Sequence, residues 1–424
     1  MKLTRLKRYL KEKEVKHPSV IRPIRKVARV VSRTPPTYPR LLRREIDAVT
    51  DVLHSPFWNM NSGGSLVHEK LEEEFAAYVG TRYAVAVNSG GMAIQMVLRA
   101  LGLKPGDEVI HQVDTCVANA FAVMAAGATP IFADINTDNF LLSPESTEAC
   151  ISPQTKVLMP IHMWGYPENL DWIIGLAKKH NLFIIEDACL AFGAETKGRK
   201  VGSNADVGVF SFGSLKPIQA GEGGMISTNN EALAKELRVL RNWGDTTIEY
   251  GIRDQKVLSW NGRISEIVAA VALEQVRGYP KYFEMIQELA ASLIDRLAGI
   301  DGIEVIMPRS ANVKPAYSQL TVKLNTKIMG VSKTELMERL RARGIGVWHA
   351  NFEPINSLTF FRDGHWRDWV LRGDLDRVEE NYKHKFATSN HVYEDIGLGF
   401  TKNNFLSKAR TNLLIKELKN ARAH

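Results

Sequence analysis

The chain has 424 residues, of which 45% are hydrophobic, enough for more than one buried core. It contains no run of 18 or more apolar residues and no cleavage site of small residues near its start, so we expect neither a transmembrane helix nor a secretory signal. The three cysteines, Cys116, Cys150 and Cys189, lack metal-ligand spacing. This argues against a bound metal and suits a reducing, cytoplasmic location.

The net charge of +8 is unevenly distributed. Residues 1–33 hold twelve Lys or Arg and two Glu, a net charge of +10, so the rest of the chain carries −2. This argues against a nucleic-acid-binding domain with a basic face. We expect residues 1–36 to form a basic N-terminal extension. Its partly helical apolar period would allow weak contact of residues 1–33 with an anionic membrane surface, although such charge runs are more often solvated or packed on a partner subunit.

From residue 66 onward, short apolar runs alternate with helical segments. Residues 69–80 predict a helix closed by Gly80. Seven Val- and Ile-rich runs predict strands, at residues 83–87, 107–114, 129–135, 156–165, 181–188, 207–212 and 224–228. Strands that alternate with helices indicate an α/β fold with a mostly parallel sheet, which binds ligands beyond the carboxyl ends of its strands.

A long helical region, residues 265–300 with an expected break at Pro280, leads to a smaller α/β part. There, residues 302–308 and 316–324 read as strands and 332–344 as a helix. We therefore expect a large domain over residues 37–285 and a small C-terminal domain over 286–424, with a cleft between them.

Four features at strand ends of the large domain carry candidate chemistry. The turn "NSGG" at residues 88–91 opens a helix, whose free N–H groups favour a phosphate. Asp187 ends a buried strand, Ser211 ends the next, and Lys216 lies in the loop after it. Each has an ordinary alternative: a polar turn, a helix cap, a backbone-bonded hydroxyl and a surface lysine.

Together these features meet one need. A pyridine cofactor with a phosphate tail requires an anion cradle, a carboxylate at the ring nitrogen and a lysine that forms an imine with the cofactor's aldehyde. Their order along the chain, always at strand ends, is more specific than any one of them. Lys216 would then be the nucleophile and would also carry a proton.

Longer stretches carry a family resemblance. They include "EEEFAAYVGTRYAVAVNSG", "IIEDACLAFGAETKGRKVGSNADVGVFSF", "GEGGMIST" and "NGRISEIVAAVALEQV". From about residue 38 to 418, the chain resembles the pyridoxal-phosphate sugar aminotransferases of the DegT/DnrJ/StrS type. The resemblance implies the aspartate-aminotransferase fold, called fold type I, with a seven-stranded sheet in the large domain.

The resemblance also implies partners and roles. Family members are homodimers with shared active sites that move an amino group from glutamate or glutamine to a keto sugar, usually nucleotide-linked. Lys216 matches the Schiff-base lysine for pyridoxal 5'-phosphate, and Asp187 the ring-nitrogen aspartate. The remaining cofactor-binding positions implied are Gly90, Gly91, Cys116, Leu190, Ser211, Asn261 and Arg263. Asn261 and Arg263 match the segment that reaches toward the neighbouring subunit.

Some positions depart from the family pattern. Gly91 replaces a usual Thr, Cys116 an aromatic residue that stacks on the cofactor, and Leu190 a Gln or His. Asn351 stands where His is usual. As an alternative function, we therefore consider a binding or regulatory protein on the same fold with little transaminase activity, associated with a membrane surface. Trp58, His162 and Asn351 are candidate substrate contacts, although packing roles are as common for such residues.

Overall fold

The computed structural model describes residues 43–56, 58, 66–306, 312–370 and 372–422. The expected basic extension, its helix and its membrane contact lie outside the described residues. The chain from Leu42 to His424 forms one compact unit. None of the helices in the described ranges is both long enough and apolar enough to span a membrane.

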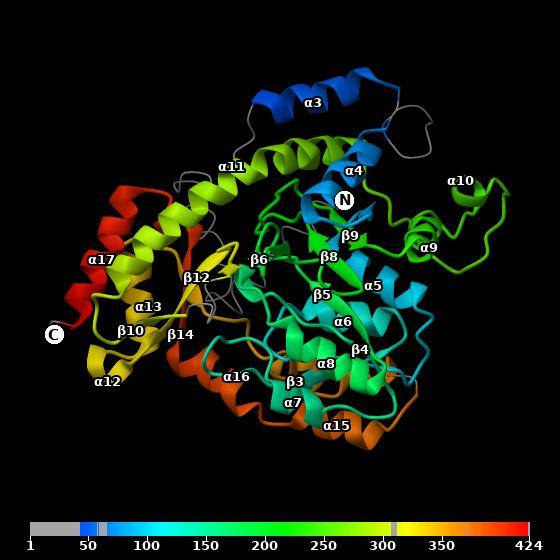
Figure 1. Cartoon of the computed structure of the whole chain (residues 1–424). Coiled ribbons are helices and arrows are strands. Elements are labelled where there is room, and N and C mark those ends of the chain that lie inside the picture. Colours follow the sequence, from blue (N-terminus) through cyan, green and yellow to red (C-terminus); the bar gives the residue numbers. More distant parts are fainter. Residues whose placement is uncertain (1–42, 57, 59–65, 307–311, 371, 423–424) are drawn as a thin grey trace, which may run out of the picture. The chain divides into compact units, whose positions relative to one another are not determined.

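A seven-stranded sheet forms the centre of the large part of the chain (Figure 1). Its strand order is β1-β9-β8-β5-β4-β2-β3, and β9 alone runs antiparallel to its neighbours. The bounds are β1 Tyr83–Val87, β2 Glu108–Gln112, β3 Thr129–Ala133, β4 Thr155–Leu158, β5 Phe183–Asp187, β8 Val207–Ser211 and β9 Gly224–Thr228. All seven predicted strands and the α/β class are therefore confirmed.

Both faces of this sheet are buried, which explains why its strands are continuously apolar. Successive side chains of a strand point to opposite faces. Accordingly, Val109 and Ile185 belong to one core cluster, while their neighbours Ile110 and Ile184 belong to another. The helices in this part of the chain are α4 Val67–Val79, α5 Gly90–Ala100, α6 Val117–Ala125, α7 Pro144–Ala149, α8 Leu170–His180, α9 Glu231–Arg241 and α10 Thr247–Tyr250.

The helix α11, Glu266–Leu297, is continuous, so the break expected at Pro280 is wrong. Proline removes one helical hydrogen bond. The buried aromatic residues beside it compensate: Tyr279 packs edge-on against Phe192, and Tyr282 and Phe283 are also buried. In Figure 1, α11 runs from beside α4 and α3, Arg43–His54, to the small sheet.

A four-stranded antiparallel sheet follows α11, in the order β10-β12-β14-β13. Its strands are β10 Ile303–Val305, β12 Gln319–Leu324, β13 Val347–His349 and β14 Gly397–Thr401. A three-stranded sheet joins β6 Glu195–Thr196 and β7 Arg199–Lys200 to β11 Val313–Lys314. The remaining helices are α12 Thr326–Met329, α13 Lys333–Ala342, α14 Thr359–Arg362, α15 Leu375–Lys383, α16 Ala387–His391 and α17 Lys408–Arg422.

Part of the C-terminal region packs on the large sheet. Phe361, Trp366 and Tyr382 join the core that includes β3. The side chain of Asn381 bonds both backbone groups of Phe132, at 2.9 and 2.8 Å, and so covers the open edge of β3. By its packing, the stretch around α14 and α15 belongs to the large sheet. The domain boundary at residue 285 stays a prediction.

Candidate active site

Three strand ends bring the predicted residues to one edge of the large sheet. Asp187 is the last residue of β5 and Ser211 the last of β8, and these two strands are parallel neighbours. Gly90 begins α5, directly after β1 and the capping residue Ser89. The sheet therefore positions these residues as the sequence predicted.

The Asp187 carboxylate is buried and fixed by two donors. The side-chain amide of Asn119 donates to Oδ2 at 2.6 Å, and the backbone N–H of Cys189 donates to Oδ1 at 3.0 Å. Each carboxylate oxygen can accept a second hydrogen bond. Asp187 is thus oriented by the protein and keeps the capacity to accept a hydrogen bond from a bound group.

Gly90 is required by close packing. A Cβ atom at this position would lie 2.8 Å from Cβ of Ser211 and 3.0 Å from Sγ of Cys189. The next residue is different, since a Cβ atom on Gly91 would meet no atom within 4 Å. The first turn of a helix has N–H groups without intrahelical acceptors. Gly90 therefore packs closely against Ser211 and Cys189, whereas open space lies beside Gly91.

Lys216 is half-buried in the loop between β8 and β9. Its backbone N–H donates to the carbonyl of Gly213 at 3.0 Å, and its own carbonyl accepts from Gln219 at 3.1 Å. Among the described residues, no hydrogen bond or ion pair holds its ammonium group. The loop is thus fixed by its backbone while the amine stays available.

The surroundings of the Cys189 thiol link several of these groups. Burial raises its pKa well above the usual range, Asp187 and Cys116 raise it further, and Lys216 lowers it. The backbone N–H of Cys189 also bonds Asp187, and its Sγ atom limits the space at Gly90, so Cys189 lies beside both residues.

Two of the departing positions border this cluster. Cys116 is half-buried and directly precedes α6. Leu190 is buried next to Cys189, and its carbonyl accepts a hydrogen bond from Oγ of Ser318 at 2.6 Å. Neither side chain offers the ring or the amide that the family pattern has at its position.

Asn261 and Arg263 lie on the segment just before α11, which is bonded to Asn88 at the end of β1. The side-chain amide of Asn88 donates to the carbonyl of Asn261 at 2.9 Å, and Nη1 of Arg263 donates to Asn242 at 2.6 Å. Burial, and then the nearby Arg241, lower the pKa of Arg263.

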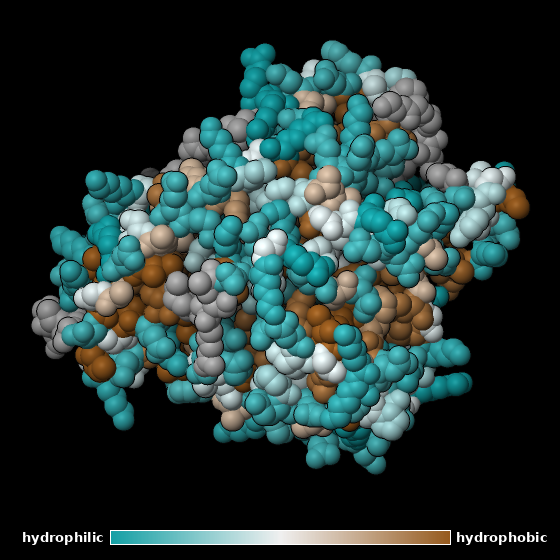
Figure 2. Space-filling view, viewed as in Figure 1, coloured by the Kyte–Doolittle hydropathy of each residue, from teal (hydrophilic) through white to brown (hydrophobic). Residues whose placement is uncertain are grey.

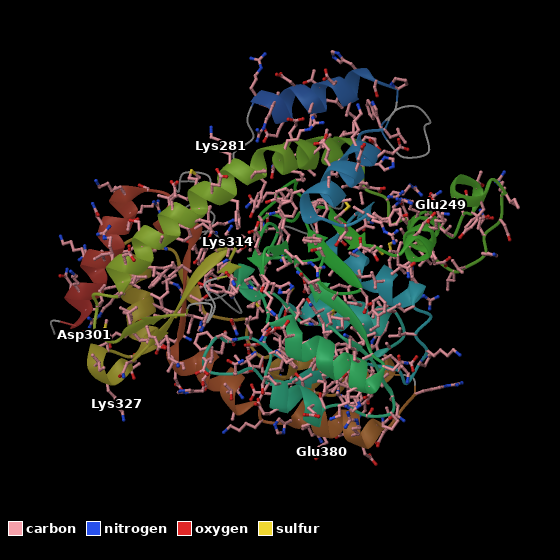
Figure 3. All side chains as sticks on the ribbon, viewed as in Figure 1. Glu249, Lys281, Asp301, Lys314, Lys327 and Glu380 are labelled. Atoms are coloured by element: carbon pink, nitrogen blue, oxygen red, sulfur yellow. The ribbon has the colours of Figure 1, made fainter. Side chains whose placement is uncertain are left out.

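Arg263 lines a cavity of about 550 Å³ that is not the Asp187 site. Its lining residues lie mainly on and around α4 and α9 and include Glu249, which Figure 3 labels, but neither Asp187 nor Lys216. It mixes guanidinium and carboxylate groups, and Arg241 pairs with Glu72 inside it. Because the cavity contains neither the lysine nor the aspartate that the predicted chemistry needs, we assign that chemistry to the Asp187 site.

The geometry favours the packing alternative for His162. The residue is fully buried, its Nδ1 accepts from the backbone N–H of Glu168 at 2.9 Å, and its Nε2 lies 3.0 Å from Glu186. A backbone N–H can only donate, so the proton of the neutral ring is on Nε2 and points to Glu186. No ring nitrogen is left for a substrate.

The other substrate candidates differ from one another. Asn351 is buried, and its amide donates to the Asp114 carboxylate and, at 3.1 Å, to the carbonyl of Phe140. Trp58 is 51% exposed, and its Nε1 donates to the carbonyl of Ser55 at 2.8 Å. Asn351 is thus occupied within the chain, whereas the Trp58 ring is open.

Sequence reasoning missed Asn119 and Asp114. Asn119 occupies the first turn of α6, three residues after Cys116, and Asp114 lies just beyond β2. Both contacts join residues far apart in the chain, Asn119 to Asp187 and Asp114 to Asn351. Only the carboxyl-end rule for parallel sheets could have singled out Asp114.

The comparisons with known proteins agree with this geometry. The sequence pattern of the DegT/DnrJ/EryC1/StrS aminotransferase family matches residues 39–368. The chain is 38% identical over 279 residues to dTDP-3-amino-3,4,6-trideoxy-alpha-D-glucose transaminase of Streptomyces venezuelae, covering 65% of this chain and 70% of that protein. It is 35% identical over 309 residues to GDP-perosamine synthase of Caulobacter vibrioides, covering 72% and 81%.

A solved structure shows the same fold. The aminotransferase from Psychrobacter cryohalolentis superposes with a TM-score of 0.82 at 26% identity, covering 92% of this chain and 99% of that one. The resemblance, the fold and the predicted transaminase activity are thereby confirmed. The chain belongs to the DegT/DnrJ/EryC1/StrS aminotransferase family.

Proposed function

We propose that this aminotransferase uses pyridoxal 5'-phosphate to move an amino group from glutamate or glutamine to a keto sugar carried on a nucleotide. The observation that carries the proposal is that Asp187, Ser211 and Gly90 meet around Cys189 at the carboxyl ends of the strands, with Lys216 in the loop that follows Ser211. The relatives' names support the acceptor class, since both are named for amino sugars linked to a nucleotide.

The residues present fit this cofactor. Open space beside Gly91 meets the first turn of α5, where N–H groups and the Ser211 hydroxyl can hold a phosphate. Asp187 keeps an accepting lone pair for a protonated ring nitrogen, and the Lys216 amine has no competing partner in the described part of the chain. When bound, pyridoxal phosphate supplies an aldehyde that joins to amines and a ring that absorbs electrons.

The chain's own residues then do the following. Asp187, oriented by Asn119, holds a proton at the ring nitrogen. Nζ of Lys216 takes a proton from the donor's Cα atom and returns one to the acceptor carbon. Leu190, buried beside the cluster, keeps water from one side of the site. A protein that served only for binding would need neither the lysine nor the oriented carboxylate.

We also propose that two copies of the chain share each active site. Leu215, adjacent to Lys216, is 68% exposed, and Leu258, shortly before Asn261, is 77% exposed. Trp243, Tyr250 and Ile252 are exposed on the segment around α10, and at the right-hand edge of Figure 2, where Figure 1 places α10, hydrophobic atoms lie among polar ones. Apolar side chains gathered at a surface mark an interface.

With free thiols on all three cysteines, the cytoplasmic location remains our expectation.

The absorbance spectrum of the purified protein tests this function. With pyridoxal phosphate, we expect a visible band that shifts when glutamate is added, and no such shift in Lys216→Ala. A protein that takes up no pyridoxal phosphate, or a variant that responds to glutamate as the wild type does, would contradict the proposal.

A further inference from the structure

Trp164 has a backbone conformation that non-glycine residues rarely adopt. It lies in the short helix Met163–Gly165 beyond β4, with φ 52° and ψ 19°. Two hydrogen bonds hold this segment: Ser318 N–H donates to the carbonyl of Trp164 at 2.9 Å, and Ala316 N–H to that of Gly165 at 2.8 Å. Strain that the surroundings enforce in this way is typical of functional positions.

The indole ring is stacked but not satisfied. It lies 5.3 Å from the ring of Phe352, with an angle of 11° between the planes, and both residues are half-buried. Nε1 of Trp164 is buried and has no acceptor among the described residues. A buried indole N–H normally donates to a partner. Since the described chain supplies no acceptor, this N–H is available to a bound molecule.

The pair lies between two segments of the candidate active site. On one side, Ser318, which bonds the Trp164 backbone, donates through Oγ to the carbonyl of Leu190. On the other side, Phe352 follows Asn351, which bonds Asp114, two residues before Cys116. The stacked rings therefore lie beyond the carboxyl ends of β4, β5 and β2, where a parallel sheet holds its ligands.

We propose that Trp164 determines acceptor specificity: its ring packs against the sugar-bearing substrate, and Nε1–H donates a hydrogen bond to an oxygen of that substrate. This inference rests on the proposed function. Nε1 is buried in this structure, so side chains at the edge of the indole ring must move before a substrate oxygen can reach it. A site with a buried donor discriminates strongly against a substrate that lacks the matching acceptor.

The test uses Trp164→Phe, which keeps an aromatic ring and removes the N–H, and measures the two half-reactions separately. In the donor half-reaction, glutamate converts the pyridoxal form. In the sugar half-reaction, dTDP-3-amino-3,4,6-trideoxy-alpha-D-glucose or GDP-perosamine serves as the probe. We expect the sugar half-reaction to lose about tenfold in kcat/KM and the donor half-reaction to change less than about twofold, because one hydrogen bond is lost to one substrate only.

Two further variants keep the test decisive. Trp369→Phe alters a tryptophan that is 59% exposed and should change neither half-reaction. Phe352→Leu leaves the N–H in place and should lower the sugar half-reaction by about threefold through lost ring contact. Equal losses in both half-reactions, or none in either, would overturn the inference.

A binding readout separates this inference from the proposed function. The indole N–H resonance of Trp164, assigned as the one missing in Trp164→Phe, should shift when either sugar is added to the wild type. If the sugars react but do not shift this resonance, and Trp164→Phe reacts with them as the wild type does, the inference fails alone. If glutamate produces no conversion, the proposed function fails.

Discussion

Glu186 and Asp187 are consecutive residues of β5, yet their surroundings differ completely. The Glu186 carboxylate accepts from the His162 ring and from the backbone N–H groups of Gly202, Asn204 and Ala205, at 2.8 to 3.0 Å. Successive strand residues face opposite sides, so Asp187 meets another environment, with two donors and spare capacity to accept, at the sheet edge where Lys216 has no partner for its amine among the described residues. A saturated carboxylate stabilises the fold, whereas one with spare capacity is available for chemistry.

Removal of Lys216 should have the largest effect on this comparison. We expect Lys216→Ala to lower the rate of amino transfer by about 10⁴-fold, because the variant loses both the nucleophile and the proton carrier. Steady-state kinetics measures this change. Lys200→Ala, which removes a lysine paired with Glu195 at 2.6 Å, is the control and should keep the wild-type rate. Similar rates in both variants would contradict the assignment.

We expect Glu186 to contribute mainly to the stability of the fold. Glu186→Ala removes the acceptor of the His162 ring and of three backbone N–H groups, one on buried Gly202 and two on half-buried Asn204 and Ala205, so the free energy of unfolding should fall by about 3 kcal/mol. Urea denaturation followed by circular dichroism measures this quantity. The control Glu195→Ala breaks only the partly exposed pairs with Lys200 and Lys314 and should cost less than about 1 kcal/mol. Equal losses would show that the Glu186 network is not a structural centre.

Asn119 sharpens the comparison on the Asp187 side. Asn119→Ala removes the 2.6 Å donor that orients the carboxylate, and we expect kcat to fall by about tenfold, the equivalent of one charge-assisted hydrogen bond. The glutamate half-reaction, followed by absorbance, measures this loss. An unchanged kcat would mean that Asp187 needs no orientation by Asn119.

Asp114 should act through the pH dependence of stability. Burial raises its pKa to about 8, against the hydrogen bonds from Asn351 and Gln112. The folded state then binds a proton that the unfolded state has released above pH 4. Stability should therefore fall as the pH rises toward about 8, by at most about 1.4 kcal/mol per pH unit, and level off above it.

Asp114→Asn should flatten this dependence. Oε1 of Gln112 is buried and has no partner in the described part of the chain. If the Gln112 side-chain amide flips, so that its O and N atoms exchange places, Oε1 can accept a hydrogen bond from the amide that the substitution introduces. Melting temperatures of both proteins between pH 5 and 9 measure the slopes. Parallel curves would show that Asp114 does not carry the proton.

The sequence predicted what local pattern and strand order determine. The runs that became β1 to β5, β8 and β9 are apolar throughout because both sheet faces are buried, and the carboxyl-end rule placed Asp187 and Ser211 correctly. Contacts between distant segments were not readable. The partners of His162 and the Asn351–Asp114 bond depend on tertiary packing, and aromatic packing kept α11 intact at Pro280.

The most direct test of the central claim locates the cofactor on the chain. The protein is loaded with pyridoxal phosphate, reduced with sodium borohydride and digested, and the masses of the peptides are measured. We predict that the added pyridoxyl mass appears on the peptide containing Lys216, and that Lys216→Ala carries none at the same protein concentration. A pyridoxyl group on another lysine, or equal labelling of the variant, would contradict the account.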